Sequence, residues 1–285
     1  MKPAPFTYHD PPTVSEALGL LAEHGGDAAV LAGGQSLIPL MNLRLARPGV
    51  VVDVNRVAGL DHVEIGSAVV RIGATARLAD LERHEGLAEV LPVLPAAIRH
   101  VAHPQIRNRT TLGGSISHAD PSAELPAVLL ATGGRVRLES VRGSRRVPAG
   151  DFFLSPFRTS RRPDELLTSV EFPIGGGLRF LMDEVARREG GLPVVSVVLG
   201  VRTGARGRVA EARAAASGVA DRPVRLRRLE RGLTGADLGD PAVRRAAADR
   251  AGHGLEPPDD LRGGGAYRVS LLRALVERLL EGAAA

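Results

Sequence analysis

Two glycine pairs, each followed by small hydroxyl or amide residues, constrain this chain more than any other sequence feature. The first lies in "AGGQSLIP" (Ala32 to Pro39) and the second in "TTLGGSISHADP" (Thr110 to Pro121). Glycine lets the backbone adopt positive φ and approach a ligand closely, and successive N–H groups in such turns form a concave anion site. Each turn alone is also typical of a glycine-rich protein, and 34 of the 285 residues are Gly.

The separation of the two motifs predicts a particular ligand. Two such turns in one domain, about 80 residues apart, could grip the two phosphates of a dinucleotide from opposite sides. Two other common nucleotide sites lack their signatures. No G-x-G-x-x-G opens a helix after a strand, and no P-loop can exist because the only lysine is Lys2.

Longer stretches around the two turns resemble a known family. The segments "AGGQSLIPLMNLRLARP" (Ala32 to Pro48) and "TLGGSISHADPSAELP" (Thr111 to Pro126) are similar to the two FAD-diphosphate loops in the flavin subunit of molybdenum hydroxylases. That family includes the medium subunit of aerobic carbon monoxide dehydrogenase and the flavin domain of xanthine dehydrogenase. The resemblance runs from Phe6 to about Leu280.

The resemblance implies an α+β fold in two parts. A two-subdomain PCMH-type FAD-binding domain is expected at residues 1–175, with subdomains at about 1–58 and 59–175. A smaller α+β C-terminal domain, an antiparallel sheet plus helices, is expected at 176–285, and Ile174-Gly175-Gly176-Gly177 favours a boundary between the two.

The resemblance also implies a set of FAD-binding residues. The stretches Val30 to Leu37 and Thr111 to Ser115 would wrap the diphosphate and ribityl chain, and Glu124, where relatives usually carry Asp, would accept a hydrogen bond from a ribose hydroxyl. Glu124 can equally be an ordinary acid at a helix N-terminus. The full set is Val30, Leu31, Ala32, Gly33, Gly34, Gln35, Ser36, Leu37, Val101, Thr111, Leu112, Gly113, Gly114, Ser115, Glu124, Leu167 and Asp183.

This chain departs from the family pattern near the expected flavin ring. Asp183 stands where relatives often carry Lys or Glu, and Gly190-Gly191-Leu192 followed by Pro193 stands where they often carry Gly-Asp and then Tyr, Phe or Ile. We expect these changes to alter ring polarity or access and to leave the diphosphate grip intact.

No nucleophile, acid/base pair or metal motif is marked by spacing, so no catalytic residue and no metal site is assigned. That absence is typical of a protein that positions a reactive cofactor. His100 and His103 lie one turn apart, but no third ligand is placed, and ordinary histidines are favoured. Without cysteine the chain cannot ligate an iron–sulfur cluster through its own thiolates.

The family resemblance therefore implies partners. An iron–sulfur small subunit and a molybdenum-cofactor large subunit would supply electrons to FAD, and an external acceptor (NAD, a quinone or oxygen) would receive them. Two other readings stay open: a stand-alone FAD-dependent oxidoreductase acting on its own small-molecule substrate, and a nucleotide-binding protein without a redox role.

Charge and hydropathy limit the binding partners and the cellular location expected of this chain. The net charge is only +5 and the arginines are spread along the chain, so nucleic acid is not expected. Arg142, Arg145 and Arg146 cluster, as do four arginines between 225 and 231, and we favour a solvated face over a docking patch. No run of about 18 apolar residues predicts a membrane span, and no signal-type start is present, so the expected location is cytoplasmic.

The periodicity of the chain predicts individual elements. Helices are expected at 14–23 with a Thr13/Glu16 capping box, and at 37–45, 77–83, 124–131, 224–231, 241–251 and 269–280. A longer helix is expected at 87–102, interrupted by Pro92 and Pro95. Strands are expected at 28–31, 50–54, 68–73, 135–141, 164–173, 194–201 and 208–216, the last two joined at 204–207.

Overall fold

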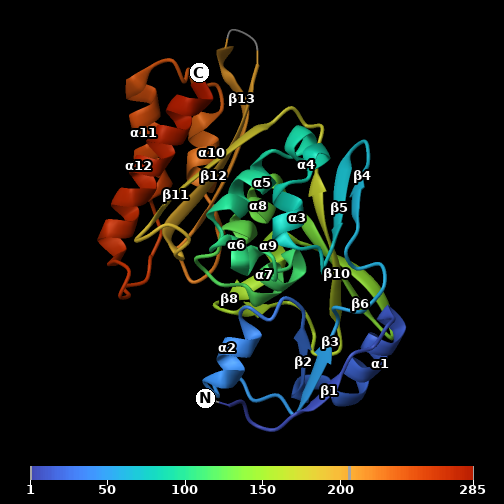
Figure 1. The fold of residues 1–285 in the computed structure, drawn as a ribbon. Helices are drawn as coiled ribbons and strands as arrows, with labels where there is room; N and C mark the ends of the chain where they lie inside the picture. Colours follow the sequence, from blue (N-terminus) through green and yellow to red (C-terminus); the bar gives the residue numbers. More distant parts are fainter. Residues whose placement is uncertain (1, 205–206, 285) are drawn as a thin grey trace.

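The computed structural model describes residues 2–204 and 207–284, and these form three larger sheets with helices packed between and around them (Figure 1). The predicted α+β class is confirmed.

The N-terminal region is a small parallel α/β unit. Its strands run in the order β1-β3-β2, and both β1 and β2 pair with β3 in parallel. Thr13 caps the first helix by accepting a hydrogen bond from the Glu16 N–H at 3.2 Å, which confirms the predicted start. The elements are β1 (Thr7–His9), α1 (Val14–His24), β2 (Ala28–Leu31), α2 (Leu37–Asn42) and β3 (Val50–Asp53).

The middle region carries a five-stranded antiparallel sheet of order β4-β5-β10-β6-β7. Its strands are β4 (Val63–Ile65), β5 (Val69–Gly73), β6 (Arg135–Ser140), β7 (Gly143–Pro148) and β10 (Leu166–Pro173). A separate two-stranded ribbon is formed by β8 (Phe153–Ser155) and β9 (Arg158–Thr159). Its helices are α3 (Leu78–Glu82), α4 (Glu85–Val90), α5 (Val93–His100), α6 (Pro104–Arg107), α7 (Leu112–His118), α8 (Glu124–Thr132) and α9 (Ala149–Phe152).

Proline divides the long helical stretch of this region. The region predicted as a helix at 87–102 with interruptions at Pro92 and Pro95 forms two helices, α4 and α5. The predicted break occurs at Pro92, which has no N–H to continue the first ladder and is the N-cap of the second helix, whereas Pro95 lies inside α5. By contrast, α8 ends where expected, with Gly133 in the left-handed conformation (φ 75°).

The C-terminal region pairs a four-stranded antiparallel sheet, β11-β12-β13-β14, with three helices. The helix predicted from Val224 begins later, because residues 224–225 pair with β13 as a short strand. The predicted turn at 204–207 includes residues 205–206, which lie outside the described residues. The elements are β11 (Arg179–Ala186), β12 (Pro193–Thr203), β13 (Val209–Ser217), β14 (Val224–Arg225), α10 (Arg227–Leu233), α11 (Pro241–Ala251) and α12 (Gly265–Ala284).

The regions stack in layers that share helices. Figure 1 shows α10, α11 and α12 on one side of the β11–β13 sheet and the middle helices, including α5 and α8, on the other. Val198 and Ala215 on that second face belong to the same apolar cluster as Ile98 of α5 and Leu129 of α8. The middle helices are therefore buried between two sheets, which fixes their position.

The first arginine cluster is neutralised by acidic partners. Arg142 pairs with Asp164, Arg145 with Glu165 at 2.7 Å, and Arg146 with Glu171 at 3.0 Å. These three arginines are thus ion-pair donors on the surface of the five-stranded sheet and do not form an uncompensated basic patch.

A fully buried arginine ties the last helix to its sheet. Arg268 on α12 is 0% exposed, donates from Nη1 to the carbonyls of Val194 (2.6 Å) and Gly218 (2.9 Å), and donates from Nη2 to Asp260. A buried guanidinium with several acceptors is costly to remove, because the acceptors are left unsatisfied.

We predict that Arg268→Met lowers the free energy of unfolding by about 3 kcal/mol, measured by urea denaturation. The matched control is Arg273→Met on the same helix. The Arg273 side chain is 44% exposed and lies 3.8 Å from Asp249, so its loss is expected to cost less than about 0.5 kcal/mol. Equal losses in the two variants would contradict this role for Arg268.

Candidate functional site

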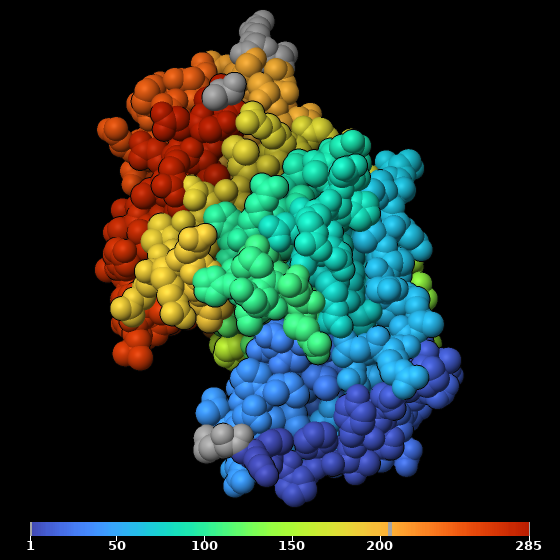
Figure 2. All heavy atoms as spheres, viewed as in Figure 1, coloured from blue at the N-terminus to red at the C-terminus, as the bar shows by residue number. Residues whose placement is uncertain are grey.

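A cleft with a volume of about 600 Å³ lies where the N-terminal region meets the middle helices. In the space-filling view the N-terminal region (blue) lies directly against the green helical segment (Figure 2). Both glycine motifs line this cleft. Its volume is within the range typical of small-molecule and cofactor sites.

The first motif is an open turn between β2 and α2. Gly34 has φ 74°, a conformation that favours glycine, and Gln35 closes the turn by donating from Nε2 to the Gly33 carbonyl at 3.2 Å. Among the described residues, the backbone N–H groups of Gly33, Gly34, Gln35 and Ser36 donate to no protein acceptor. Consecutive free N–H groups beside a cleft are suited to bind an anion.

The second motif differs from the expected loop. It is the first part of helix α7, with Thr111 as the N-cap, and no residue from 112 to 115 has positive φ. Its backbone N–H groups are mostly used: Leu112 donates to Ala76, Gly113 to Ala74 and Ser115 to Thr111. The Gly114 N–H donates to Thr111 Oγ1 at 3.2 Å. The expected second backbone cradle is therefore wrong, and this motif offers mainly hydroxyl groups.

Glycine at position 113 has a packing reason. A Cβ there would lie 2.7 Å from the Ala74 Cα, against the turn after β5. This distance is too short for any side chain, so Gly113 allows α7 to lie on that turn.

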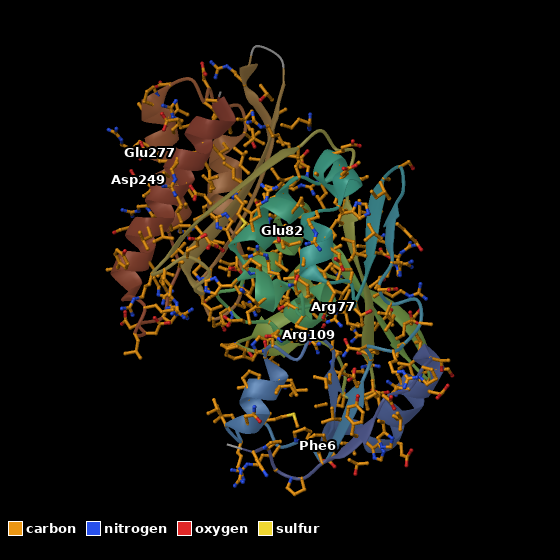
Figure 3. All side chains as sticks on the ribbon, viewed as in Figure 1. Phe6, Arg77, Glu82, Arg109, Asp249 and Glu277 are labelled. Carbon is orange, nitrogen blue, oxygen red and sulfur yellow. The ribbon has the colours of Figure 1, made fainter. Side chains whose placement is uncertain are left out.

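The two motifs also touch each other. A Cβ at Gly33 would meet the Arg109 carbonyl oxygen and would lie 2.9 Å from the Thr110 Cα. Arg77, together with Asn55, connects the two motifs at this contact. Its guanidinium donates to the Arg109 carbonyl and to Asn55 Oδ1, and Asn55 Nδ2 donates to the Ala32 carbonyl at 2.8 Å. Figure 3 shows Arg77 and Arg109 together at this junction.

Most residues of the expected site line the cleft. They are Val30, Ala32, Gly33, Gly34, Gln35, Ser36, Leu37, Val101, Thr111, Gly113, Gly114, Ser115, Glu124 and Leu167. Leu192, one of the departures from the family pattern, lines it as well.

Three of the expected residues are placed elsewhere. Leu112 is fully buried in the core, and Leu31 packs beside Gly34 without lining the cleft. Asp183 forms an ion pair with Arg278 of α12. Side chains alternate along a strand, so the acid of β11 that faces the middle helices is the next residue, Glu184.

Glu124 is a buried acid at the edge of the cleft. Glu124 is the first residue of α8 and is 4% exposed. Burial, followed by the charge of Glu184, raises the pKa of Glu124 to about 8. At neutral pH the group is thus a neutral carboxyl, which can donate as well as accept a hydrogen bond.

Other polar groups of the cleft were not assigned from the sequence. His118 and Asp120 lie within the second motif itself, and burial lowers the pKa of His118. Arg161 lines the cleft and donates from Nη1 to the carbonyls of Arg162 and Glu165, at 3.0 and 2.6 Å. Nothing in the arginine-rich turn around Arg161 distinguishes it in sequence.

Comparison with known proteins gives the class. Residues 4–175 match the family described as the FAD binding domain in molybdopterin dehydrogenase, and residues 181–283 match the CO dehydrogenase flavoprotein C-terminal domain. The chain belongs to this family of flavoprotein subunits, and FAD is its cofactor.

Individual relatives match over nearly the whole chain. The 6-hydroxypseudooxynicotine dehydrogenase complex subunit alpha of Paenarthrobacter nicotinovorans is 39% identical over 98% of this chain and 95% of its own. The carbon monoxide dehydrogenase medium chain of Hydrogenophaga pseudoflava is 35% identical over 99% of this chain and 98% of its own. A crystal structure of quinoline 2-oxidoreductase from Pseudomonas putida 86 has a TM-score of 0.95 and 35% identity, covering 100% and 98%.

The cleft fits FAD in its chemistry. Free N–H groups of the first motif, hydroxyls of the second and the Arg161 guanidinium suit an anionic diphosphate. Val101, Ile106, Leu167 and Leu192 supply apolar walls that suit a flat ring system. Within the described part of the chain no helix is long and apolar enough to cross a membrane, and no group of three or more potential ligands forms a metal site.

The raised pKa of Glu124 predicts a pH dependence of stability. Between 4.5 and about 8 the folded state holds a proton that the unfolded state has lost, so the free energy of unfolding falls as pH rises through this window. Without bound cofactor, Glu124→Gln is expected to match the natural chain near pH 4.5 and to be more stable by on the order of 3 kcal/mol at pH 7. Thermal unfolding at several pH values measures this, and parallel profiles would contradict it.

Proposed function

We propose that this chain is the electron-transferring flavin subunit of a molybdenum hydroxylase complex. It takes electrons from iron–sulfur clusters of a small partner subunit, which receives them from a large subunit with the molybdenum cofactor, and passes them to an external acceptor. The observation that carries this proposal is that both family motifs line one cleft. Relatives are named as subunits of such dehydrogenases, and this chain has no cysteine to hold a cluster itself.

Each motif has its own part in binding the cofactor. The free N–H groups of Gly33 to Ser36 hold the diphosphate, and the hydroxyls of Thr111 and Ser115 add hydrogen bonds from the other wall. Arg161 offsets phosphate charge. Val101, Leu167 and Leu192 enclose the flavin ring, which supplies the electron-accepting chemistry when bound, and these apolar side chains exclude water from it.

The domain division follows the same assignment. We place the FAD-binding domain at 1–175, with subdomains at about 1–58 and 59–175, and the C-terminal domain at 176–285. The extents of the two matching family regions support it, as does a separate apolar core around β12, β13, α11 and α12. We assign the complex to the cytoplasm, because a chain without cysteine needs no disulfide and is suited to a reducing compartment.

The substrate of the complex is selected outside this chain. The relatives carry the names of enzymes for nicotine, glyceraldehyde, caffeine and carbon monoxide. One flavin-subunit architecture therefore serves oxidations of very different molecules.

The functional assignment predicts what purifies with the protein. A tagged chain isolated from its own host is expected to show flavin absorbance and to bring with it polypeptides that contain iron, sulfide and molybdenum. A chain that carries FAD but oxidises a small substrate by itself, without partners, would favour the stand-alone flavoenzyme. A colourless preparation would contradict FAD binding.

The contact between the motifs predicts a binding defect. In Gly33→Ala the new Cβ would press on Arg109 and Thr110 and separate the two motifs, so FAD affinity is expected to fall at least about tenfold, or about 1.4 kcal/mol. The control is Gly26→Ala, where a Cβ meets nothing within 4 Å. Flavin fluorescence titration of the cofactor-free chains measures both, and equal affinities would contradict the proposed grip.

A further inference from the structure

A buried polar strip crosses the C-terminal sheet and ends at the cleft. Glu184, Ser196 and Ser217 are directly opposed on β11, β12 and β13, so their side chains lie on one face of the sheet. Ser217 Oγ donates to the carbonyl of Ala123 at 2.7 Å. The next residue is Glu124, which lines the cleft.

Two polar atoms of this strip have no protein partner. Within residues 2–204 and 207–284, Glu184 Oε2 and Ser196 Oγ are buried and make no hydrogen bond. The Glu184 side chain is 6% exposed and Ser196 is 0% exposed. Buried polar atoms are almost always satisfied, by ordered water where protein offers nothing. Because the two residues oppose each other in register, this location suits bound water.

His100 gives the strip an outlet to solvent. Its Nδ1 lies 3.4 Å from Glu184 Oε1, and its side chain is 40% exposed. Interaction with Glu184, partly opposed by burial, raises the pKa of His100. Glu184 thus lies beside an exposed imidazole, and its charge also reaches Glu124 at the cleft. An imidazole, and a carboxyl whose pKa is raised toward 7, exchange protons readily near neutral pH.

We propose that His100, Glu184 and Glu124 form a proton-transfer path between solvent and the flavin cleft, with ordered water linking the two glutamates. This inference rests on the proposed function, since it requires FAD in the cleft. Flavin reduction takes up protons together with the electrons that the iron–sulfur partner supplies. A proton enters at His100 and passes to Glu184 and then to Glu124, whose own proton is released into the cleft that holds the cofactor. When the external acceptor removes the electrons, a proton that does not leave with them passes back from Glu124 to Glu184 and His100 and so to solvent.

Two aspartates also lie near the path. Asp120 interacts with Glu124, and Asp183 adds to the field at His100. Asp183 itself is held by Arg278 on α12, on the opposite face of β11 from Glu184. Neither aspartate joins His100 to the cleft.

The test separates electron arrival from proton arrival. Pulse radiolysis delivers electrons to the FAD-loaded chain without protons, and the spectral change that follows reports protonation of the reduced flavin. In Glu184→Gln and His100→Gln we expect protonation to slow by about tenfold or more, with FAD affinity unchanged. Imidazole added to His100→Ala is expected to restore the rate, which a purely structural role would not do.

The control is Glu211→Gln, which removes a carboxylate of β13 that pairs with Arg202 and Arg213, outside the path. It is expected to protonate as fast as the natural chain. Unchanged rates in both path variants, or equal slowing in the control, would overturn the path and leave the FAD assignment standing. A chain that binds no FAD would instead refute the proposed function.

Discussion

The contact between Gly33 and the backbone of Arg109 and Thr110 is the constraint on which the site depends. It lets a turn from the parallel N-terminal sheet approach the segment that leads into α7, although the two are far apart in the chain. The Arg77 guanidinium and the Asn55 amide then connect the Arg109 and Ala32 carbonyls. Side-chain hydrogen bonds to backbone carbonyls fix main-chain positions directly, so the cleft walls are set before any ligand arrives.

This junction gives its two sides different roles. The first motif keeps its N–H groups free, and the second spends most of them on Ala74, Ala76 and Thr111. Its glycine at 113 serves packing on Ala74. A glycine pair in sequence therefore indicates close approach, but the approaching group can be ligand or protein. In one wall of the cleft the backbone N–H groups already have protein partners, and in the other wall they are free. An anion is therefore bound from one side, which fixes its orientation.

The sequence predicted much of the fold and less of the site chemistry. Local signals placed α1, β2, α8 and α11 closely, because caps, glycines and apolar periods act within a few residues. The break at Pro92 was predicted from the proline itself. The interruption predicted at Pro95 does not occur, because Pro95 lies in the first turn of α5, where its missing N–H breaks no helical hydrogen bond. The two strand residues at 224–225 could not be foreseen, since their pairing partner is β13.

Side-chain direction along β11 shows what sequence could not provide. The family resemblance placed Asp183 at the cofactor site. Successive side chains of a strand lie on opposite faces of the sheet, however, so a difference of one residue decides which face an acid occupies. Asp183 reaches Arg278, and Glu184 faces the helices between the two sheets. Arg161 likewise gains its position only from the tertiary fold.

The layered architecture explains why an acid of the C-terminal sheet can matter to a cleft built by the other regions. Helices α5 and α8 are packed between two sheets, with His100 at the end of one and Glu124 at the start of the other. Both ends face β11 to β13, where the apolar packing of Val198 and Ala215 gives way to Glu184, Ser196 and Ser217. Burying these polar groups costs stability unless they are satisfied, and replacing them with apolar residues would remove that cost. The proposed proton path gives these polar groups a role beside the cleft that offsets this cost.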